Sequence, residues 1–134
     1  YFTHSIETII WAAKNEKSKH IFNYETMRLI NNGKQMKSVW TMPAPNGTEK
    51  LFGKHPTQKP VQLLERIILA STNEGALVFD PFSGSSTTGV AAVLSKRRFV
   101  GCELESEFIQ LSIRRLENAV RERTSLLIAE EKRK

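Results

Sequence analysis

The second half of the chain alternates helix-forming and strand-forming segments, and this alternation restricts the fold more than any other feature of the sequence. After Pro60, apolar residues recur at helical spacing over 63–68, which predicts a helix. A continuous apolar run follows at 76–79 and a second strand is expected at 98–102, with a helix of small residues between them at 87–95. Such runs are typical of strands that are buried on both faces of a parallel sheet. The pattern therefore predicts an α/β fold, with helices flanking a mostly parallel, partial Rossmann-like sheet.

A last helix is expected to begin near Ser106 and to run nearly to the end of the chain. The residues predicted to face inward from it are Phe108, Leu111, Leu116 and Val120. Residues 121–134 mix basic and acidic side chains, which is typical of a solvated helical tail. The length of 134 residues suits one domain, 1–134, with a modest core.

The signals before Pro60 are weaker. A β-branched and aromatic run at 7–13 predicts a strand, and 38–42 is a possible second strand. A short helix is expected at 24–32, where Asn31-Asn32-Gly33 would end it. The proline and glycine residues of 43–53 predict a loop.

Composition limits the class of protein. The chain carries 20 Lys and Arg against 14 Asp and Glu, a net charge of +6. Such a balance favours polyanionic partners, but on charge alone a solvated helical tail is the preferred interpretation. No apolar run approaches the roughly 20 residues of a membrane span, so no membrane association is expected. Cys102 is the single cysteine, which favours a reducing cytoplasm. The opening residues Tyr1 to His4 resemble no signal peptide and suggest the middle of a longer sequence.

Chemistry is expected first at the turn that follows the 76–79 run. Gly84 lets the backbone approach a ligand, and Ser85, Ser86 and Thr87 can cap the next helix. The free N–H groups of a helix start attract an anion such as a carboxylate. Asp80 leaves the strand at the same edge, where it could meet an ammonium group. A ligand that carries both an α-amino and an α-carboxyl group would suit the pair.

Glu103 is the second candidate. It lies 23 positions after Asp80, at the end of the next predicted strand. An acidic residue about 20 positions after a glycine-rich turn commonly accepts hydrogen bonds from ribose hydroxyls. The two sites together predict a nucleoside joined to an amino acid. The alternatives are a phosphate-binding loop, which lacks its Gly-Lys-Ser/Thr, a dinucleotide fingerprint, which lacks its first glycine, and a capping turn beside an unrelated surface glutamate.

A third segment, residues 54–60, carries a histidine and two prolines before the predicted helix. Taken alone, it fits an ordinary helix start. Taken with Asp80-Pro81-Phe82-Ser83-Gly84-Ser85 and Gly101-Cys102-Glu103, it resembles the bacterial N6-adenine/N4-cytosine DNA methyltransferases, in the arrangement in which catalytic motifs precede the cofactor motifs. The resemblance covers about residues 4–119, and the strand-like segment 4–14 belongs to it.

The resemblance implies the fold and the cofactor. It implies part of an S-adenosylmethionine-dependent methyltransferase fold, in which the turn lines the methionine part of S-adenosylmethionine and Glu103 holds its ribose. The residues of that turn are Asp80, Phe82, Ser83, Gly84, Ser85 and Ser86. His55, Pro56, Thr57 and Lys59 would close the cofactor pocket, with Lys59 or Thr57 near the carboxylate. The family commonly has glycine where this chain has Ser86, which is tolerable if the backbone stays at negative φ. No metal is implied.

The catalytic tetrapeptide of the family, Asp/Asn/Ser-Pro-Pro-aromatic, is absent, because no two of the 5 prolines are adjacent. Residues 33–54 could form a short target-recognition loop, with Lys34, Lys37, Trp40 and Lys50 as candidate DNA contacts. The first hypothesis is therefore the cofactor-binding part of a restriction-modification DNA methyltransferase, for adenine N6 more than cytosine N4. It would be inactive alone, and its partners would be double-stranded DNA and an N-terminal half or a second copy. The second is a non-catalytic DNA-binding module that keeps the fold.

Overall fold

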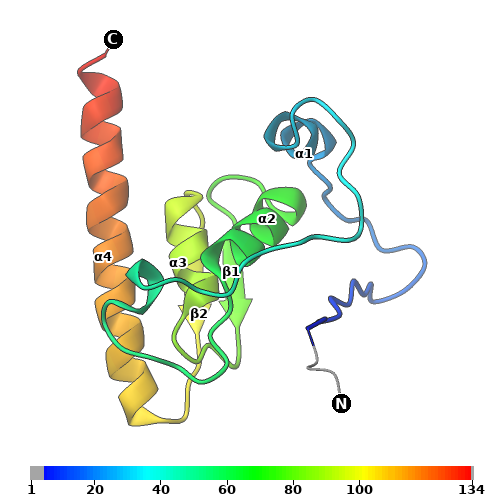
Figure 1. Ribbon diagram of the computed structural model, residues 1–134. Coiled ribbons are helices and arrows are strands. Elements are labelled where there is room, and N and C mark those ends of the chain that lie inside the picture. The colour runs from blue at the N-terminus through cyan, green and yellow to red at the C-terminus, as the bar shows by residue number, and fades with distance from the viewer. Residues whose placement is uncertain (1–4, 134) are drawn as a thin grey trace.

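The computed structural model describes residues 5–133 and shows a small parallel sheet with helices beside it (Figure 1). The elements in chain order are α1 (Tyr24–Ile30), a short 3-10 helix η1 (Thr48–Lys50), α2 (Val61–Ser71), β1 (Leu77–Asp80), α3 (Thr87–Leu94), β2 (Arg98–Gly101) and α4 (Ser106–Glu131). The predicted α/β alternation of the second half is confirmed, and each boundary lies close to its predicted position.

The sheet consists of β1 and β2, which pair in parallel with Leu77 opposite Arg98 and Asp80 opposite Gly101. The register brings the two strand ends to one edge, so the chain segments that follow Asp80 and Gly101 leave the sheet side by side. Parallel strands require a crossover connection, and α3 supplies it.

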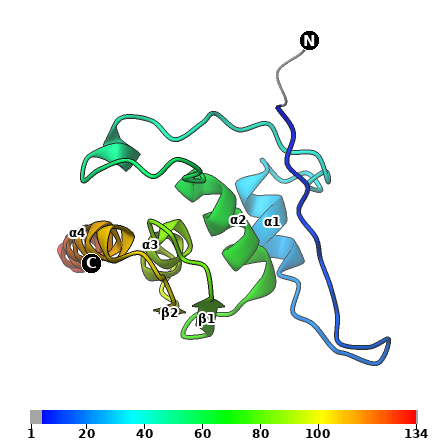
Figure 2. The same ribbon diagram turned by 90° about the horizontal axis from the view of Figure 1, so that it is seen from below.

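All the helices lie on one face of this sheet, as the view along α4 shows (Figure 2). Helix α3 packs against both strands, with α2 and α4 on its two sides and α1 beyond α2. The core is formed by Ile68, Ala91 and Ala92. The small side chains of α3 let its neighbours approach closely: a Cβ at Gly89 would lie 2.6 Å from the Phe99 ring and 2.8 Å from Leu116.

The opposite face of the sheet is uncovered, and the prediction of strands buried on both faces is wrong for this chain. Leu77 is 55% exposed, Phe79 60% and Val100 48%. Side chains alternate across a strand, so these residues share the face that turns away from α3. Apolar runs of this kind are suited to a second covering layer, which residues 5–133 do not supply.

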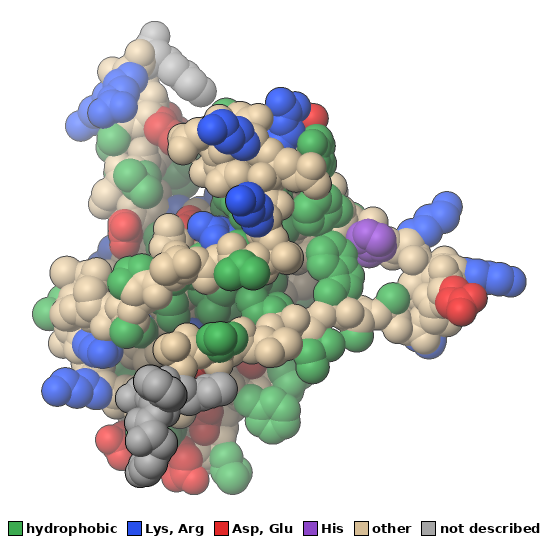
Figure 3. Space-filling view, turned by 45° about the vertical axis from the view of Figure 1, so that its right-hand side comes forward, with side chains coloured by type: hydrophobic (Ala, Val, Ile, Leu, Met, Phe, Trp, Pro, Cys, Tyr) green, Lys and Arg blue, Asp and Glu red, His purple; other side chains and the backbone are tan. Residues whose placement is uncertain are grey.

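The two strands predicted in the first half are also not formed. Residues 7–13 and 38–42 are extended or bent chain without ladder pairing. Strand propensity expresses the fit of a side chain to a sheet and needs a neighbouring strand. Figure 3 shows apolar side chains spread over one face of the molecule. Within the N-terminal segment, Ile6, Ile10 and Trp11 are exposed. The part of the 4–14 prediction that concerns His4 lies outside the described residues.

Helix α4 runs for 26 residues and confirms the helical tail over 121–131. Its inward side includes Leu111, Ser112, Arg115 and Ala119. Val120 was expected to face inward as well, but it is 52% exposed, because it lies on the side of the helix turned away from α3. Within residues 5–133, no helix is long and apolar enough to cross a membrane.

Candidate functional site

The predicted turn and the predicted acidic residue meet at the carboxyl edge of the sheet. The Gly84 N–H donates to Glu103 Oε2 at 2.8 Å, and the backbone N–H groups of Leu104 and Glu105 donate to Oε1 at 2.9 and 3.0 Å. The sheet pattern continues past the strand ends, since the Ser83 N–H donates to the Cys102 carbonyl at 2.8 Å. The loop after β1 and the loop after β2 therefore form one unit.

These backbone donors lower the pKa of Glu103, with Glu105 the largest contributor and Gly84, Leu104 and the charge of His55 adding to it. Hydrogen bonds from N–H groups favour the ionised carboxylate. Ionised Glu103 therefore contributes to the stability of the fold. This contribution is fully present above the ordinary glutamate pKa, and it is lost as the pH falls through the lowered pKa. At neutral pH the site presents an anion with lone pairs left for further donors.

Asp80, the last residue of β1, is turned toward the loop. Its Oδ1 accepts from the Phe82 N–H at 3.1 Å, and its Oδ2 accepts from the Thr88 hydroxyl at 2.6 Å. The side chain therefore ties the start of the turn to the first turn of α3. Its expected contact with a ligand ammonium group stays a prediction.

Two residues of the turn have left-handed backbone. Gly84 has φ +51°, and a Cβ there would lie 3.1 Å from His55 Nε2. Both the backbone conformation and the close contact favour glycine at this position. Ser86, the N-cap of α3, has φ 55° and ψ 42°, and it makes no side-chain cap bond. The condition under which a serine was held to be tolerable here, a negative φ, is not met, and the capping role considered for Ser86 is not observed. This conformation is strained for any residue with a Cβ, so the position favours glycine.

We expect Ser86→Gly to raise the free energy of unfolding by about 0.5–1 kcal/mol, the relief of left-handed strain less the added freedom of the unfolded chain. Urea unfolding followed by circular dichroism measures it. Ser86→Ala is the matched control, since it removes the hydroxyl but keeps the Cβ and its strain. If the alanine variant were as stable as the glycine variant, strain would not be the cause.

His55 lies against this unit from the segment before α2. Its ring packs on Phe108 of α4, with centroids 4.2 Å apart, and its Nε2 faces Gly84. Its Nδ1 accepts from the Thr57 N–H at 3.3 Å. The structure thus brings His55 together with Gly84 and Glu103, a juxtaposition that sequence spacing alone did not give.

The other residues predicted in that segment do not contact the turn as His55 does. Pro56 and Thr57 are exposed. The Lys59 Nζ pairs with Glu7 Oε1 of the N-terminal segment at 2.6 Å. The predicted position of Lys59 near a ligand carboxylate stays a prediction.

A contact that the sequence analysis missed holds the turn from behind. Arg115 is nearly fully buried, and its Nη1 donates to the Ser85 carbonyl, to Ser85 Oγ at 2.8 Å and to Thr87 Oγ1 at 3.0 Å. One helical turn earlier, the Ser112 hydroxyl donates to the Gly84 carbonyl at 2.8 Å. Burial lowers the pKa of the Arg115 guanidinium, and the charge of Glu49 opposes this. In the sequence, the only sign of this contact is that Ser112 and Arg115 lie three residues apart and so share one face of α4. That spacing does not indicate which residues they bind.

The outer rim of the site is apolar and open. Phe82 is 89% exposed and Leu104 is 91% exposed, one in each of the two loops. A cavity of about 350 Å³ lies elsewhere, between η1, α3 and α4, and its lining includes Phe52, Val90 and Arg115. Among the described residues, that lining contains neither Asp80 nor Glu103, so the cavity is separate from the candidate site.

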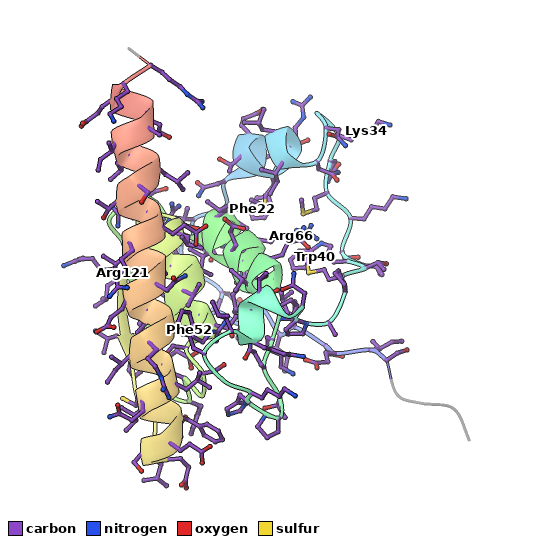
Figure 4. All side chains as sticks on the ribbon, turned by 60° about the vertical axis from the view of Figure 1, so that its left-hand side comes forward. Phe22, Lys34, Trp40, Phe52, Arg66 and Arg121 are labelled. Atoms are coloured by element: carbon purple, nitrogen blue, oxygen red, sulfur yellow. The ribbon has the colours of Figure 1, made fainter. Side chains whose placement is uncertain are left out.

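The candidate DNA contacts are spread along the 33–54 segment. Trp40 packs on Arg66 of α2, with the guanidinium carbon 4.9 Å from the ring centroid, and its Nε1 donates to the Lys37 carbonyl at 2.6 Å (Figure 4). Trp40 thus pins the loop to the body. Lys34 projects from the loop after α1, whereas Lys50 ends η1 on the α4 side (Figures 1 and 4).

Comparisons with known proteins agree with this geometry. The family model N6_N4_Mtase, described as DNA methylase, matches residues 1–114. The chain is 57% identical over 118 residues to the type II methyltransferase M2.DpnII of Streptococcus pneumoniae, a match that covers 87% of this chain and 44% of that protein. It is 56% identical over 115 residues to the type II methyltransferase M2.MboI of Moraxella bovis, covering 86% of this chain and 42% of that protein.

Among solved structures, the M1.HpyAVI–SAM complex is similar, with a TM-score of 0.58 and 38% identity over 75% of this chain and 45% of that one. The chain therefore spans less than half the length of each of these relatives.

Proposed function

The chain belongs to the N6/N4 DNA methylase family, and from this premise we propose that it is the S-adenosylmethionine-binding part of a site-specific DNA amino-methyltransferase. The observation that carries the proposal is the hydrogen bond of 2.8 Å between the Gly84 N–H and Glu103 Oε2. It puts a left-handed glycine turn and an ionised carboxylate at the carboxyl ends of adjacent parallel strands, where such sheets bind ligands.

Different residues of the site would bind different parts of the cofactor. Glu103 has acceptor capacity left beyond its backbone donors, which suits a pair of ribose hydroxyls. The turn from Asp80 to Ser86 would hold the amino acid end of the cofactor, and His55 would close it from the side of Gly84. The exposed Phe82 and Leu104 offer apolar surface to a flat base. When bound, the cofactor supplies an electrophilic methyl group, and this chain's residues bind and orient it.

We place the target-base chemistry in the part of the longer relatives that this chain does not include. The Asp/Asn/Ser-Pro-Pro-aromatic tetrapeptide that would accept hydrogen bonds from the exocyclic amine and stack on a flipped base is absent from these residues. Adenine N6 is the acceptor we favour over cytosine N4. Lys34, Lys37 and Lys50 would add phosphate contacts from the 33–54 loop, with Trp40 supporting the loop.

Calorimetric titration with S-adenosylmethionine tests the cofactor proposal. The wild-type chain is expected to bind, and Glu103→Gln is expected to weaken binding about 10- to 100-fold, which corresponds to roughly 1–3 kcal/mol for a hydrogen bond to a charged group. Glutamine keeps one oxygen for the Leu104 and Glu105 N–H groups and loses the acceptor for the Gly84 N–H, so circular dichroism must show that the variant stays folded. Glu105→Gln is the matched control, since this neighbouring side chain is exposed.

The alternative, a DNA-binding module without cofactor, gives a different result. In that case neither protein takes up S-adenosylmethionine, while a gel-shift assay still detects DNA binding. This pair of results would reject the cofactor proposal.

A further inference from the structure

The turn that follows β1 has at its centre a peptide group that no bond within the turn orients. The Ser86 N–H donates to the Ser83 carbonyl at 2.7 Å and closes a four-residue turn over 83–86. The peptide that joins Gly84 to Ser85 lies in the middle of this turn and takes no part in the closing bond. In β-turns the central peptide occurs in two opposite orientations, which distinguish type I from type II and their mirror images. A contact from outside the turn can therefore select the orientation.

Ser112 of α4 supplies this contact. Its hydroxyl donates to the Gly84 carbonyl at 2.8 Å, and the residue is only 6% exposed, so little water competes for the bond. The peptide is trans, and its N–H, which belongs to Ser85, points opposite to the carbonyl, away from Ser112. One turn further along α4, Arg115 binds the Ser85 carbonyl. Helix α4 therefore holds two successive carbonyls of the turn and leaves the Ser85 N–H facing the other way.

The Ser85 N–H is a buried donor. Within residues 5–133 no acceptor pairs with it, although Ser85 is only 3% exposed. Buried N–H groups in folded proteins almost always have a partner, because leaving one unpaired costs as much as a lost hydrogen bond. Helix α3 begins two residues later, and the positive end of its dipole favours a negatively charged acceptor. The Ser85 N–H is therefore suited to a carboxylate oxygen.

We propose that Ser112 is a positioning residue for the cofactor: it holds the Gly84 carbonyl and thereby aims the Ser85 N–H at the carboxylate of S-adenosylmethionine. This role rests on the proposed function, since it concerns the amino acid end of the same cofactor. Arg115 serves the fold through its own bonds to Ser85 and Thr87, and these bonds remain when Ser112 is changed. Removing the Ser112 hydroxyl is therefore expected to release one peptide without unfolding the domain.

The test compares two ligands by calorimetry on the intact chain. Ser112→Ala is expected to weaken the binding of S-adenosylmethionine about 3- to 10-fold, the usual effect of one hydrogen bond. Methylthioadenosine keeps the adenosyl group and lacks the amino acid end, so its affinity is expected to stay within about 2-fold of the wild type. Ser125→Ala is the matched control, because that hydroxyl also lies on α4 but donates only to the Arg121 carbonyl of its own helix, at 3.0 Å. Circular dichroism shows that each variant is folded.

A second measurement needs no ligand. The nuclear Overhauser effect between the Gly84 α-protons and the Ser85 amide proton reports the orientation of their peptide, and it is expected to change in Ser112→Ala but not in Ser125→Ala. Equal weakening of both ligands, an unchanged affinity for S-adenosylmethionine, or an unchanged Overhauser effect in Ser112→Ala would overturn the positioning role. If the wild-type chain takes up neither ligand, the proposed function fails, and the Overhauser comparison alone decides whether Ser112 orients the peptide.

Discussion

Replacing Arg115 with alanine is expected to lower the free energy of unfolding by about 3–4 kcal/mol. The guanidinium is the donor to three acceptors on Ser85 and Thr87, all buried. Each buried acceptor left without a donor costs roughly 1–3 kcal/mol, and the three losses overlap because they share one nitrogen. Since whole domains are stable by only about 5–15 kcal/mol, this loss removes a large share of the stability of the fold.

Two further variants separate the donor role from charge and position. Arg115→Lys keeps the charge but presents a single point donor, so it is expected to lose about half as much stability. Arg114→Ala changes the preceding, exposed side chain and is expected to stay within about 0.5 kcal/mol of the wild type. Urea unfolding followed by circular dichroism gives all three values. Equal losses for Arg115→Ala and Arg114→Ala would show that the buried bonds do not hold the turn.

The second half of the fold could be predicted from the sequence because its local signals agree with one another. Pro60 at a helix start, the 76–79 run and the small residues of 87–95 each specify their element without help from distant residues. The parallel pairing followed from the helix between the strands, and the meeting of Gly84 with Glu103 followed from the pairing. Each of these contacts involves segments that follow one another closely in the sequence.

The first half failed because its segments depend on partners. The 7–13 and 38–42 runs have strand composition, yet a strand is defined by its ladder, and residues 5–133 offer neither run a neighbour. Leu77 and Phe79 of the sheet are exposed for the same reason, because residues 5–133 supply no layer to cover them. Chains that span twice this length can supply both the covering layer and the missing ladder.

The candidate site was predicted in outline and missed in detail. Strand ends and residue types located Asp80, Gly84 and Glu103, because chemistry at parallel sheets gathers at that edge. The left-handed φ of Ser86 could not be read from a serine, whose preferences point to ordinary capping. Nor could spacing reveal that Arg115 reaches Ser85, 30 residues away in sequence.

The prediction with the largest expected effect concerns methyl transfer itself. The chain alone is expected to transfer no detectable methyl group to DNA, because binding a cofactor without orienting the acceptor amine leaves the reaction at its uncatalysed rate. Adding an N-terminal segment of a relative that contains the Pro-Pro-aromatic tetrapeptide, as a fusion or a separate polypeptide, is expected to raise transfer on the order of 10³-fold or more. Labelled methyl groups in DNA measure it, and mass spectrometry identifies the product as N6-methyladenine or N4-methylcytosine.

The controls use the same complemented system. A segment whose tetrapeptide aromatic residue is alanine keeps the covering layer and loses base stacking, so it is expected to restore folding without restoring transfer. Complementation with the intact segment but with Glu103→Gln in this chain is expected to raise the KM for S-adenosylmethionine, since that variant weakens cofactor binding. Transfer by the chain alone at the level of the complemented system would contradict the division of labour, and it would require an acceptor site within residues 1–134 that the family pattern does not place there.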